Sequence, residues 1–133
     1  MKKLRLRKAI ISLIILLILA CLTYGIITYR DYSALANSDM YADGPISIDA
    51  HIPPVVHSYN RLKANPFAVQ IFMRLEKNGT SEGKMYALTA LKIADIDYFN
   101  SLEAKYQASN EMAHCIIGCI MSDTYLRDLF EHQ

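Results

Sequence analysis

Apolar positions divide the chain into an uninterrupted run near the N-terminus and a periodic region after residue 65. Residues 9–29 are 21 positions without a charged side chain, and 12 of them are Leu or Ile. A helix of that length is about 31 Å long, which matches the roughly 30 Å hydrocarbon core of a bilayer. The sequence therefore predicts a transmembrane or signal-anchor helix over residues 9–29.

The region after residue 65 repeats its apolar residues at helical spacing. Asn65-Pro66 predicts a helix start, because Asn accepts hydrogen bonds from free amides and Pro needs no donor in the first turn. The apolar face of this first helix is expected to contain Phe67, Val69, Ile71, Phe72 and Leu75.

Polar residues that favour helix N-termini mark the later helices. A second helix is expected after Thr80 or Ser81, and a third after Asp95 or Asp97. A fourth is expected after Ser109, and a final helical piece after Ser122 or Asp123. The fourth helix would carry an apolar face of Met112, Ile116, Ile117 and Ile120. Because the connections are short, consecutive helices are expected to form antiparallel hairpins. The predicted fold is mainly α, with a small helical domain over residues 55–133.

Residues 30–54 lack a clear period and are predicted to form a stalk or connecting loop. Asp43-Gly44-Pro45 is a turn signal, and Pro53-Pro54 is interpreted as blocking regular helix or central strand. Ile46 and Ile48 alternate with polar residues, which favours a short edge strand within this segment.

The charge distribution sets the expected orientation of the chain. Residues 1–8 form a basic tail of five cations without an acid, whereas Arg30 on the other side of the apolar run is followed by Asp31. The positive-inside rule places the tail in the cytoplasm and the helical domain on the extracytoplasmic, periplasmic side of the inner membrane. From residue 37 onward the net charge is −4, which argues against nucleic acid as a partner.

The apolar run has three possible outcomes, of which a retained anchor is expected because the run is longer than a usual signal-peptide core. Cleavage after Ala36 is an alternative, since Ala34-Leu35-Ala36 has the small-x-small form that signal peptidases recognise. Lipid attachment at Cys21 is the other, because residues 18–21 loosely resemble a bacterial lipobox. Cys21 is otherwise a small apolar residue within the span.

Cys115 and Cys119 could form a disulfide, remain free thiols or take a metal or redox role. An oxidising compartment favours a disulfide, but two cysteines four positions apart on one continuous helix would strain it, so two buried or partly buried thiols are the alternative. His114 beside Cys115 suggests a metal or redox role, although this spacing matches structural zinc poorly.

Asp49, His51 and His57 form the other cluster that suggests a site, and they are more typical of an exposed loop. The sequence contains no catalytic constellation on a defined element. We therefore expect no catalytic or metal-binding residues, no cofactor and no enzymatic activity.

Residues 79–88 form the most distinctive motif. Gly79 would end one helix in a left-handed turn, Thr80 would cap the next, and Gly83 would let a neighbouring helix approach closely. An anion site is the alternative, because free amides at a helix start with Lys84 nearby suit a carboxylate or phosphate. Tyr86 is expected to pack against the first helix with its hydroxyl at the surface.

Gly79-Thr80-Ser81-Glu82-Gly83-Lys84-Met85-Tyr86-Ala87-Leu88, with Leu91, Asp97 and Gly118-Cys119-Ile120, resembles a group of small bacterial envelope proteins. These proteins carry HEAT-like helical hairpins behind a signal or anchor sequence and share a Gly-Thr-x-x-Gly-Lys/Arg-x-Tyr-Ala motif. The resemblance covers about residues 67–121, with Ser-Glu where many relatives have Pro-Ala and with an added Cys115. It implies a helical fold and an envelope location, without an established activity.

The expected function is a binding or accessory module anchored in the lipid bilayer, with another envelope protein as its partner. Self-protection against a toxin is one alternative, which the resemblance suggests through some members of the group. An envelope enzyme or metal- or ligand-binding protein is the other. Tyrosines are common contact residues in interfaces, and the candidates are Tyr41, Tyr59, Tyr98, Tyr106 and Tyr125.

Overall fold

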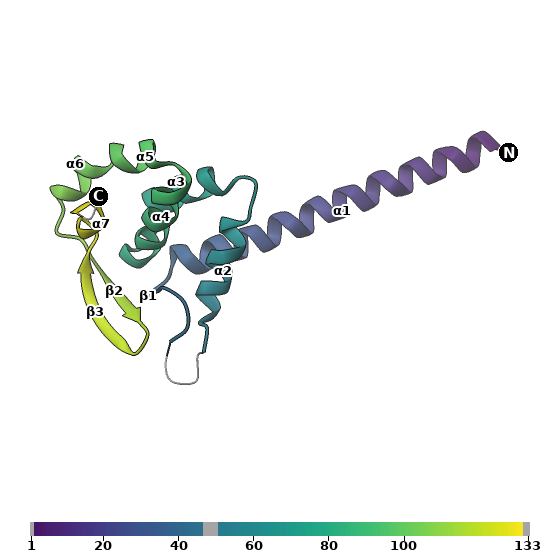
Figure 1. The fold of residues 1–133 in the computed structure, drawn as a ribbon. Helices are drawn as coiled ribbons and strands as arrows, with labels where there is room; N and C mark the ends of the chain where they lie inside the picture. The colour runs from purple at the N-terminus through teal and green to yellow at the C-terminus, as the bar shows by residue number, and fades with distance from the viewer. Residues whose placement is uncertain (1, 47–50, 132–133) are drawn as a thin grey trace. The chain divides into compact units, whose positions relative to one another are not determined.

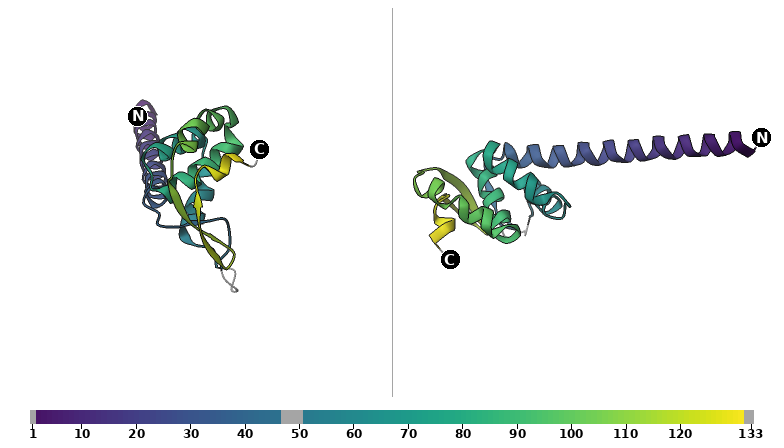
Figure 2. Two further views of the ribbon diagram at one scale, coloured as in Figure 1. Left: turned by 90° about the vertical axis from the view of Figure 1, so that its left-hand side faces the viewer. Right: turned by 90° about the horizontal axis from the view of Figure 1, so that it is seen from above.

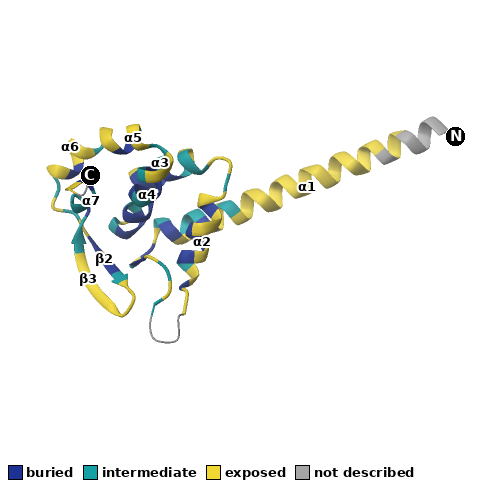
Figure 3. Ribbon diagram, viewed as in Figure 1, coloured by how far each residue is buried: buried dark blue, intermediate teal, exposed yellow. Residues whose placement is uncertain are grey.

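The computed structural model describes residues 2–46 and 51–131, which belong to two compact units that divide between Arg30 and Asp31. The first unit is the larger part of helix α1 (Lys2–Ala36), whose side chains from Ile10 to Tyr29 are almost all exposed (Figure 1 and Figure 3). The stretch Ile10–Ala36 is long and apolar enough to cross a membrane. This agrees with the predicted transmembrane or signal-anchor helix.

The last turns of α1 belong to the second unit, which we call the C-terminal domain. Leu35 is fully buried in its core. The buried carboxylate of Asp31 accepts hydrogen bonds from the Ser58 hydroxyl at 2.9 Å and from Arg61 Nε at 2.7 Å. Residues 31–36 are therefore part of the folded domain, and the prediction that a stalk begins at residue 30 is wrong.

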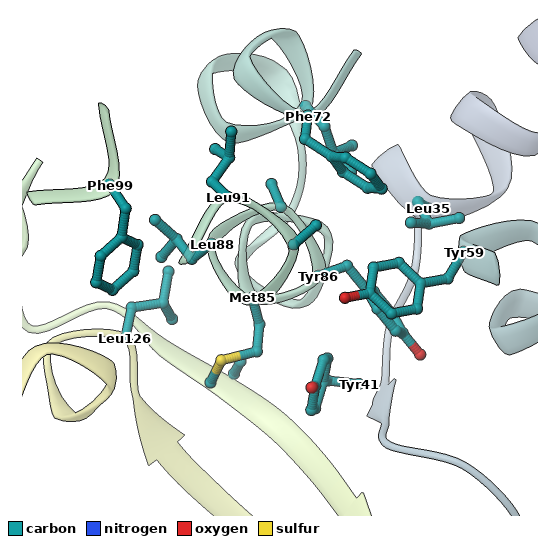
Figure 4. Packing of buried hydrophobic residues seen from close by; sticks show 14 of the residues in the cluster. Leu35, Tyr41, Tyr59, Phe72, Met85, Tyr86, Leu88, Leu91, Phe99 and Leu126 are labelled. Carbon is teal, nitrogen blue, oxygen red and sulfur yellow. The ribbon is translucent and has the colours of Figure 1, made fainter. Parts of the chain in front are cut away.

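Helix α4 (Ser81–Ala94) is the centre of the domain. Side chains leave it in several directions to meet the rest of the core, as Figure 4 shows for Met85, Tyr86, Leu88 and Leu91. Helix α3 (Ala68–Asn78) packs against α4 through Phe72 and Leu75. These two helices confirm the first two predicted helical segments, although Phe67 is exposed rather than part of the buried face.

Four shorter helices complete the helical part of the domain within residues 31–46 and 51–131. They are α2 (Pro54–Lys63), α5 (Ile96–Ser101), α6 (Glu103–Gln107) and α7 (Asp128–Glu131). Asp95 caps α5 by accepting a hydrogen bond from the Tyr98 amide, as predicted. The sequence did not predict helix α2, because Pro53-Pro54 was interpreted as blocking a helix. In the structure Pro54 occupies the first helical position, where the missing backbone N–H of proline costs nothing.

Two strands replace the predicted fourth helix. Strand β2 (Met112–Ile117) and strand β3 (Ile120–Tyr125) form an antiparallel hairpin, and β1 (Tyr41–Ala42) pairs parallel with β2, giving the order β1-β2-β3. The hairpin extends beyond α4 in Figure 1 and in the left view of Figure 2. Ser122 and Asp123, expected to start a helix, lie in β3 instead. An uninterrupted array of helical hairpins is therefore wrong for the last quarter of the chain.

Aromatic side chains fill the core on both sides of α4. Tyr41, Tyr59 and Tyr86 form one group, with the Tyr41 and Tyr86 ring centres 4.7 Å apart. Phe99 and Phe130 stack at 4.3 Å in the other. Three of the tyrosines proposed as contact residues are thus core residues, namely Tyr41, Tyr59 and Tyr106.

Candidate functional site

Thr80 joins the start of α4 to the segment that follows α1. Its hydroxyl oxygen accepts a hydrogen bond from the Gly83 amide at 3.2 Å, and its hydroxyl proton is donated to the Ser38 carbonyl oxygen at 2.7 Å. The Thr80 amide donates to the carbonyl oxygen of Ala36 at 3.0 Å. The predicted cap is present, and it also fixes residues 36–38 against the helix.

Gly83 allows a close approach of backbone to backbone. A Cβ atom at this position would lie 2.6 Å from the carbonyl oxygen of Leu35, which no real Cβ tolerates. The close approach predicted for Gly83 is therefore seen, with the end of α1 as the neighbour. Gly79 does not adopt the predicted left-handed conformation, because its φ is −82° and its ψ is 165°.

Lys84 meets an anion of its own chain. Its Nζ atom lies 2.8 Å from a carboxylate oxygen of Glu111, and the Ser81 hydroxyl donates to the same oxygen at 3.0 Å. A carboxylate thus lies at the first turn of α4, where the helix dipole favours negative charge. The arrangement predicted for an external anion is used here to hold the segment before β2 against α4.

Tyr86 is buried, so the prediction of a surface hydroxyl is wrong. Its hydroxyl oxygen accepts from the Ala42 amide at 2.9 Å and lies 3.4 Å from the Ala42 carbonyl oxygen. Burial raises the pKa of Tyr86 to about 12, despite the opposing effect of its backbone hydrogen bond. The Tyr86 side chain therefore stabilises β1 and remains a neutral phenol at physiological pH.

Cys115 and Cys119 lie on a hairpin that the sequence did not predict. Cys115 is buried in β2, and burial raises the pKa of its thiol. Cys119 is exposed in the two-residue turn of the hairpin, and Cys21 is exposed in α1. All three are free thiols in this structure. Because Cys115 lies in a strand and Cys119 in the turn that follows it, the shared helix face considered for these two residues does not exist.

His51 and His57 do not belong to a cluster of metal-binding side chains within the described residues. His51 is exposed and pairs through its backbone with Ile46, and His57 is exposed on α2. Asp49 and Ile48 lie outside the described residues. Within residues 2–46 and 51–131, no group of three His, Cys, Asp or Glu side chains is arranged to hold a metal ion.

The β2–β3 hairpin exposes three large apolar side chains next to its turn. Ile117, Ile120 and Met121 are 61%, 71% and 78% exposed, and they flank the turn at Gly118, whose φ is +62°. The base of the hairpin is anchored, because Ala113 and Cys115 are buried against the core. A rigid base thus presents apolar side chains to solvent, which is unusual unless another surface covers them.

An open pocket of about 500 Å³ adjoins this apolar surface. Ile116 and Met121 contribute its apolar part, and Asp39 and Asp123 contribute carboxylates. The remaining lining residues are Met40, His114, Cys115 and Ser122. Two acids beside an apolar surface suit a cation with an aliphatic stem.

His114 and Asp123 form a cross-strand pair beside the pocket. The Nδ1 atom of His114 lies 2.5 Å from a carboxylate oxygen of Asp123, and both side chains are exposed. The hydrogen bond with Asp123, followed by the attraction of its charge, raises the pKa of His114 above 6.5. The Glu82 carboxylate accepts a hydrogen bond from the His114 amide at 3.1 Å, on the side of β2 that faces away from β3.

The hairpin and its pocket were missed because their apolar residues also fit a helix. Positions 112, 116, 117 and 120 agree with a helical face, and this agreement determined the prediction. The usable signal was the Gly118-Cys119 pair between two runs rich in apolar residues, since a two-residue connection containing Gly is typical of a hairpin.

Comparison of the chain with protein-family models, with curated proteins and with solved structures finds no match. Over the residues that the structure describes, the fold is mainly helical, with one helix able to cross a membrane and a small C-terminal domain that presents an apolar hairpin.

Proposed function

We propose that the protein is a membrane-anchored binding module that holds another protein of the cell envelope through its β2–β3 hairpin. The observation that carries this proposal is the exposure of Ile117, Ile120 and Met121 on a hairpin whose base is fixed in the core. Binding of a partner that removes these apolar side chains from water lowers the free energy of the complex.

A retained anchor would keep the C-terminal domain attached to a bilayer. The five cations of residues 1–8 and the Arg30–Asp31 pair favour a cytoplasmic N-terminus and an extracytoplasmic domain in a single-pass inner-membrane protein. Retention of the anchor is supported by the end of α1, because cleavage after Ala36 would remove Leu35 and Asp31 from the domain. Lipid attachment at Cys21 would leave both residues in place. The intact mass of the protein purified from membranes distinguishes these three forms.

A toxin acting in the envelope is one possible partner within this proposal. The support is the resemblance of residues 79–88 to HEAT-like envelope proteins, some of which are associated with self-protection. Cells that lack this protein should then be sensitive to the toxin, and cells that express it should survive. Equal sensitivity of the two strains would remove this form of the proposal.

The direct test is photo-crosslinking in intact cells. A photoreactive amino acid replaces Ile120 in the hairpin, and the matched control carries it at Ile93, which is 82% exposed on α4. We expect one envelope protein to crosslink from position 120 and not from position 93. Equal products from both positions, or no protein product from position 120, would contradict a binding role for the hairpin.

A further inference from the structure

The hydrogen-bond pattern of the hairpin determines which backbone groups of β3 point outward. The Leu126 amide donates to the Glu111 carbonyl at 3.0 Å, which makes these two residues a hydrogen-bonded pair. Such pairs alternate along an antiparallel ladder, so Ala113–Thr124, Cys115–Ser122 and Ile117–Ile120 are bonded in the same way. The amide and carbonyl groups of Met121, Asp123 and Tyr125 therefore face away from β2.

That outer edge of β3 is open within the part of the chain that the structure describes. The sheet order there ends at β3, whereas the other side of β2 is occupied by β1 and by the Glu82 carboxylate. Ile120 to Asp123 are exposed. Residues 120–125 contain no Pro or Lys, the residues that commonly protect an edge strand from pairing.

We propose that β3 accepts an extended segment of the partner protein as an additional strand, with a Lys or Arg of that segment opposite Asp123. This inference rests on the proposed function and specifies how the hairpin binds. Main-chain hydrogen bonds to Met121, Asp123 and Tyr125 would supply affinity, and the side chains on the neighbouring face would supply specificity.

The side chains near this edge favour a basic segment. Met121, Asp123 and Tyr125 alternate with Ser122 and Thr124, which lie opposite the buried residues of β2, so all three lie on the other face of β3. The pocket on this face combines Ile116 and Met121 with the carboxylates of Asp39 and Asp123, and one oxygen of Asp123 also meets the His114 ring. The aliphatic stem of a Lys or Arg would cover the apolar part of the pocket, and its charged end would reach the two acids.

A second copy of the chain fits this edge less well. In an antiparallel pair of two β3 strands, outward-facing residues oppose outward-facing residues, so Asp123 can face only Met121, Asp123 or Tyr125 of the other copy. None of these side chains is a cation, and Asp123 opposite Asp123 is repulsive. Charge therefore favours a different, basic chain over self-association.

The edge is tested by adding Met121→Pro to the protein that carries the photoreactive residue at position 120. Proline removes an outward-facing N–H without removing a bond to β2, so the hairpin can persist while strand addition cannot. Met121→Ala is the matched control, because it shortens the same side chain and keeps the N–H. We expect the crosslinked product to fall about tenfold with Met121→Pro and less with Met121→Ala.

Retention of the hairpin in the Met121→Pro variant is measured separately. Cys115 is buried at the base of the hairpin, so a folded hairpin protects its thiol from maleimide. If Cys115 becomes reactive, proline is moved to Tyr125, whose N–H also faces outward, with Tyr125→Ala as the matched control. An undiminished product from a protected proline variant would overturn strand addition and leave the binding role of the hairpin intact.

The charge of the occupant is tested by mapping the crosslink and reversing Asp123. We expect the crosslinked segment of the partner to contain a Lys or Arg within two residues of the attachment point. Asp123→Lys should abolish the product, and replacing that partner cation by Asp should restore it. A mapped segment without a cation, a crosslink to a second copy of this chain or a lipid adduct would overturn the inference. Absence of any product from the unsubstituted hairpin would instead reject the proposed function itself.

Discussion

Gly83 is the residue at which helix α4 meets the end of α1. The carbonyl oxygen of Leu35 occupies the place that a Cβ atom would need. The Thr80 hydroxyl donates a hydrogen bond to the carbonyl oxygen of Ser38, shortly after the end of α1. A glycine within a helix ordinarily lowers its stability relative to alanine. Its presence here is explained by the close approach of the two backbones.

Gly83→Ala is therefore expected to lower the free energy of unfolding by about 1–3 kcal/mol, because the added methyl group displaces the Leu35 backbone. Urea unfolding of the full chain in nanodiscs, followed by the near-ultraviolet circular dichroism of the buried tyrosines, measures the change. Helix propensity alone predicts the opposite sign, a gain of up to about 1 kcal/mol, so a stabilised variant would contradict the contact.

His114 is expected to titrate above 6.5, because the hydrogen bond and charge of Asp123 favour its protonated form. The pair stabilises the hairpin fully below the unfolded-state pKa, and this contribution is lost as the pH rises through the folded-state pKa. NMR titration of the His114 ring measures the value. Asp123→Asn should lower the pKa of His114, and an unchanged value would show that the pair is absent in solution.

At the scale of elements, the sequence could predict the starts of α4 and α5 because capping is local. Thr80 and Asp95 each bind an amide three residues away, and these spacings are visible in the sequence. The same holds for the glycine at position 83, whose small size signals a close neighbour without identifying it. The neighbour itself, Leu35, lies too far away in the sequence for any local pattern to identify.

The hairpin could not be predicted in this way, because its strands are stabilised by distant residues. Cys115 pairs with Tyr41 of β1, and the His114 amide bonds Glu82 of α4. The apolar residues at 112, 116, 117 and 120 fit a helical period, and tertiary contacts override that local preference. The position of Tyr86 was also missed, because its hydrogen-bond partner Ala42 lies in a segment predicted to be irregular.

Thiol accessibility distinguishes the hairpin from the helix that the sequence suggested. In a Cys21→Ser background, we expect maleimide to react rapidly with Cys119 in the turn and slowly with Cys115 in the buried strand. Urea should make both thiols reactive. Mass spectrometry of the labelled peptides measures the ratio, and similar rates for the two cysteines in the folded protein would contradict the hairpin.

At the scale of the whole molecule, helix α1 contains both the stretch that is long and apolar enough to cross a membrane and part of the domain core. Leu35 is fully buried although it follows the apolar run by only six positions. The Asp31 carboxylate binds Ser58 and Arg61 of α2. The end of α1 is thus required for the domain to be complete.

Leu35→Ala is expected to lower the free energy of unfolding of the domain by about 2–5 kcal/mol, since it leaves a cavity in the core. Ile93→Ala is the control, because that side chain is exposed and its loss should change the free energy by less than about 0.5 kcal/mol. Urea unfolding in nanodiscs measures both variants. Equal effects of the two substitutions would show that residues 31–36 lie outside the domain.

The pairing of β1 with β2 has a consequence for the order of events during synthesis. Tyr41 leaves the ribosome soon after α1, but its partner Cys115 is made much later. Contacts between such distant residues form late. The apolar residues around Tyr41 must therefore remain without their final neighbours until β2 has been synthesised. We expect nascent chains that stop before residue 111 to be sensitive to protease, and chains that include β3 and α7 to become resistant together.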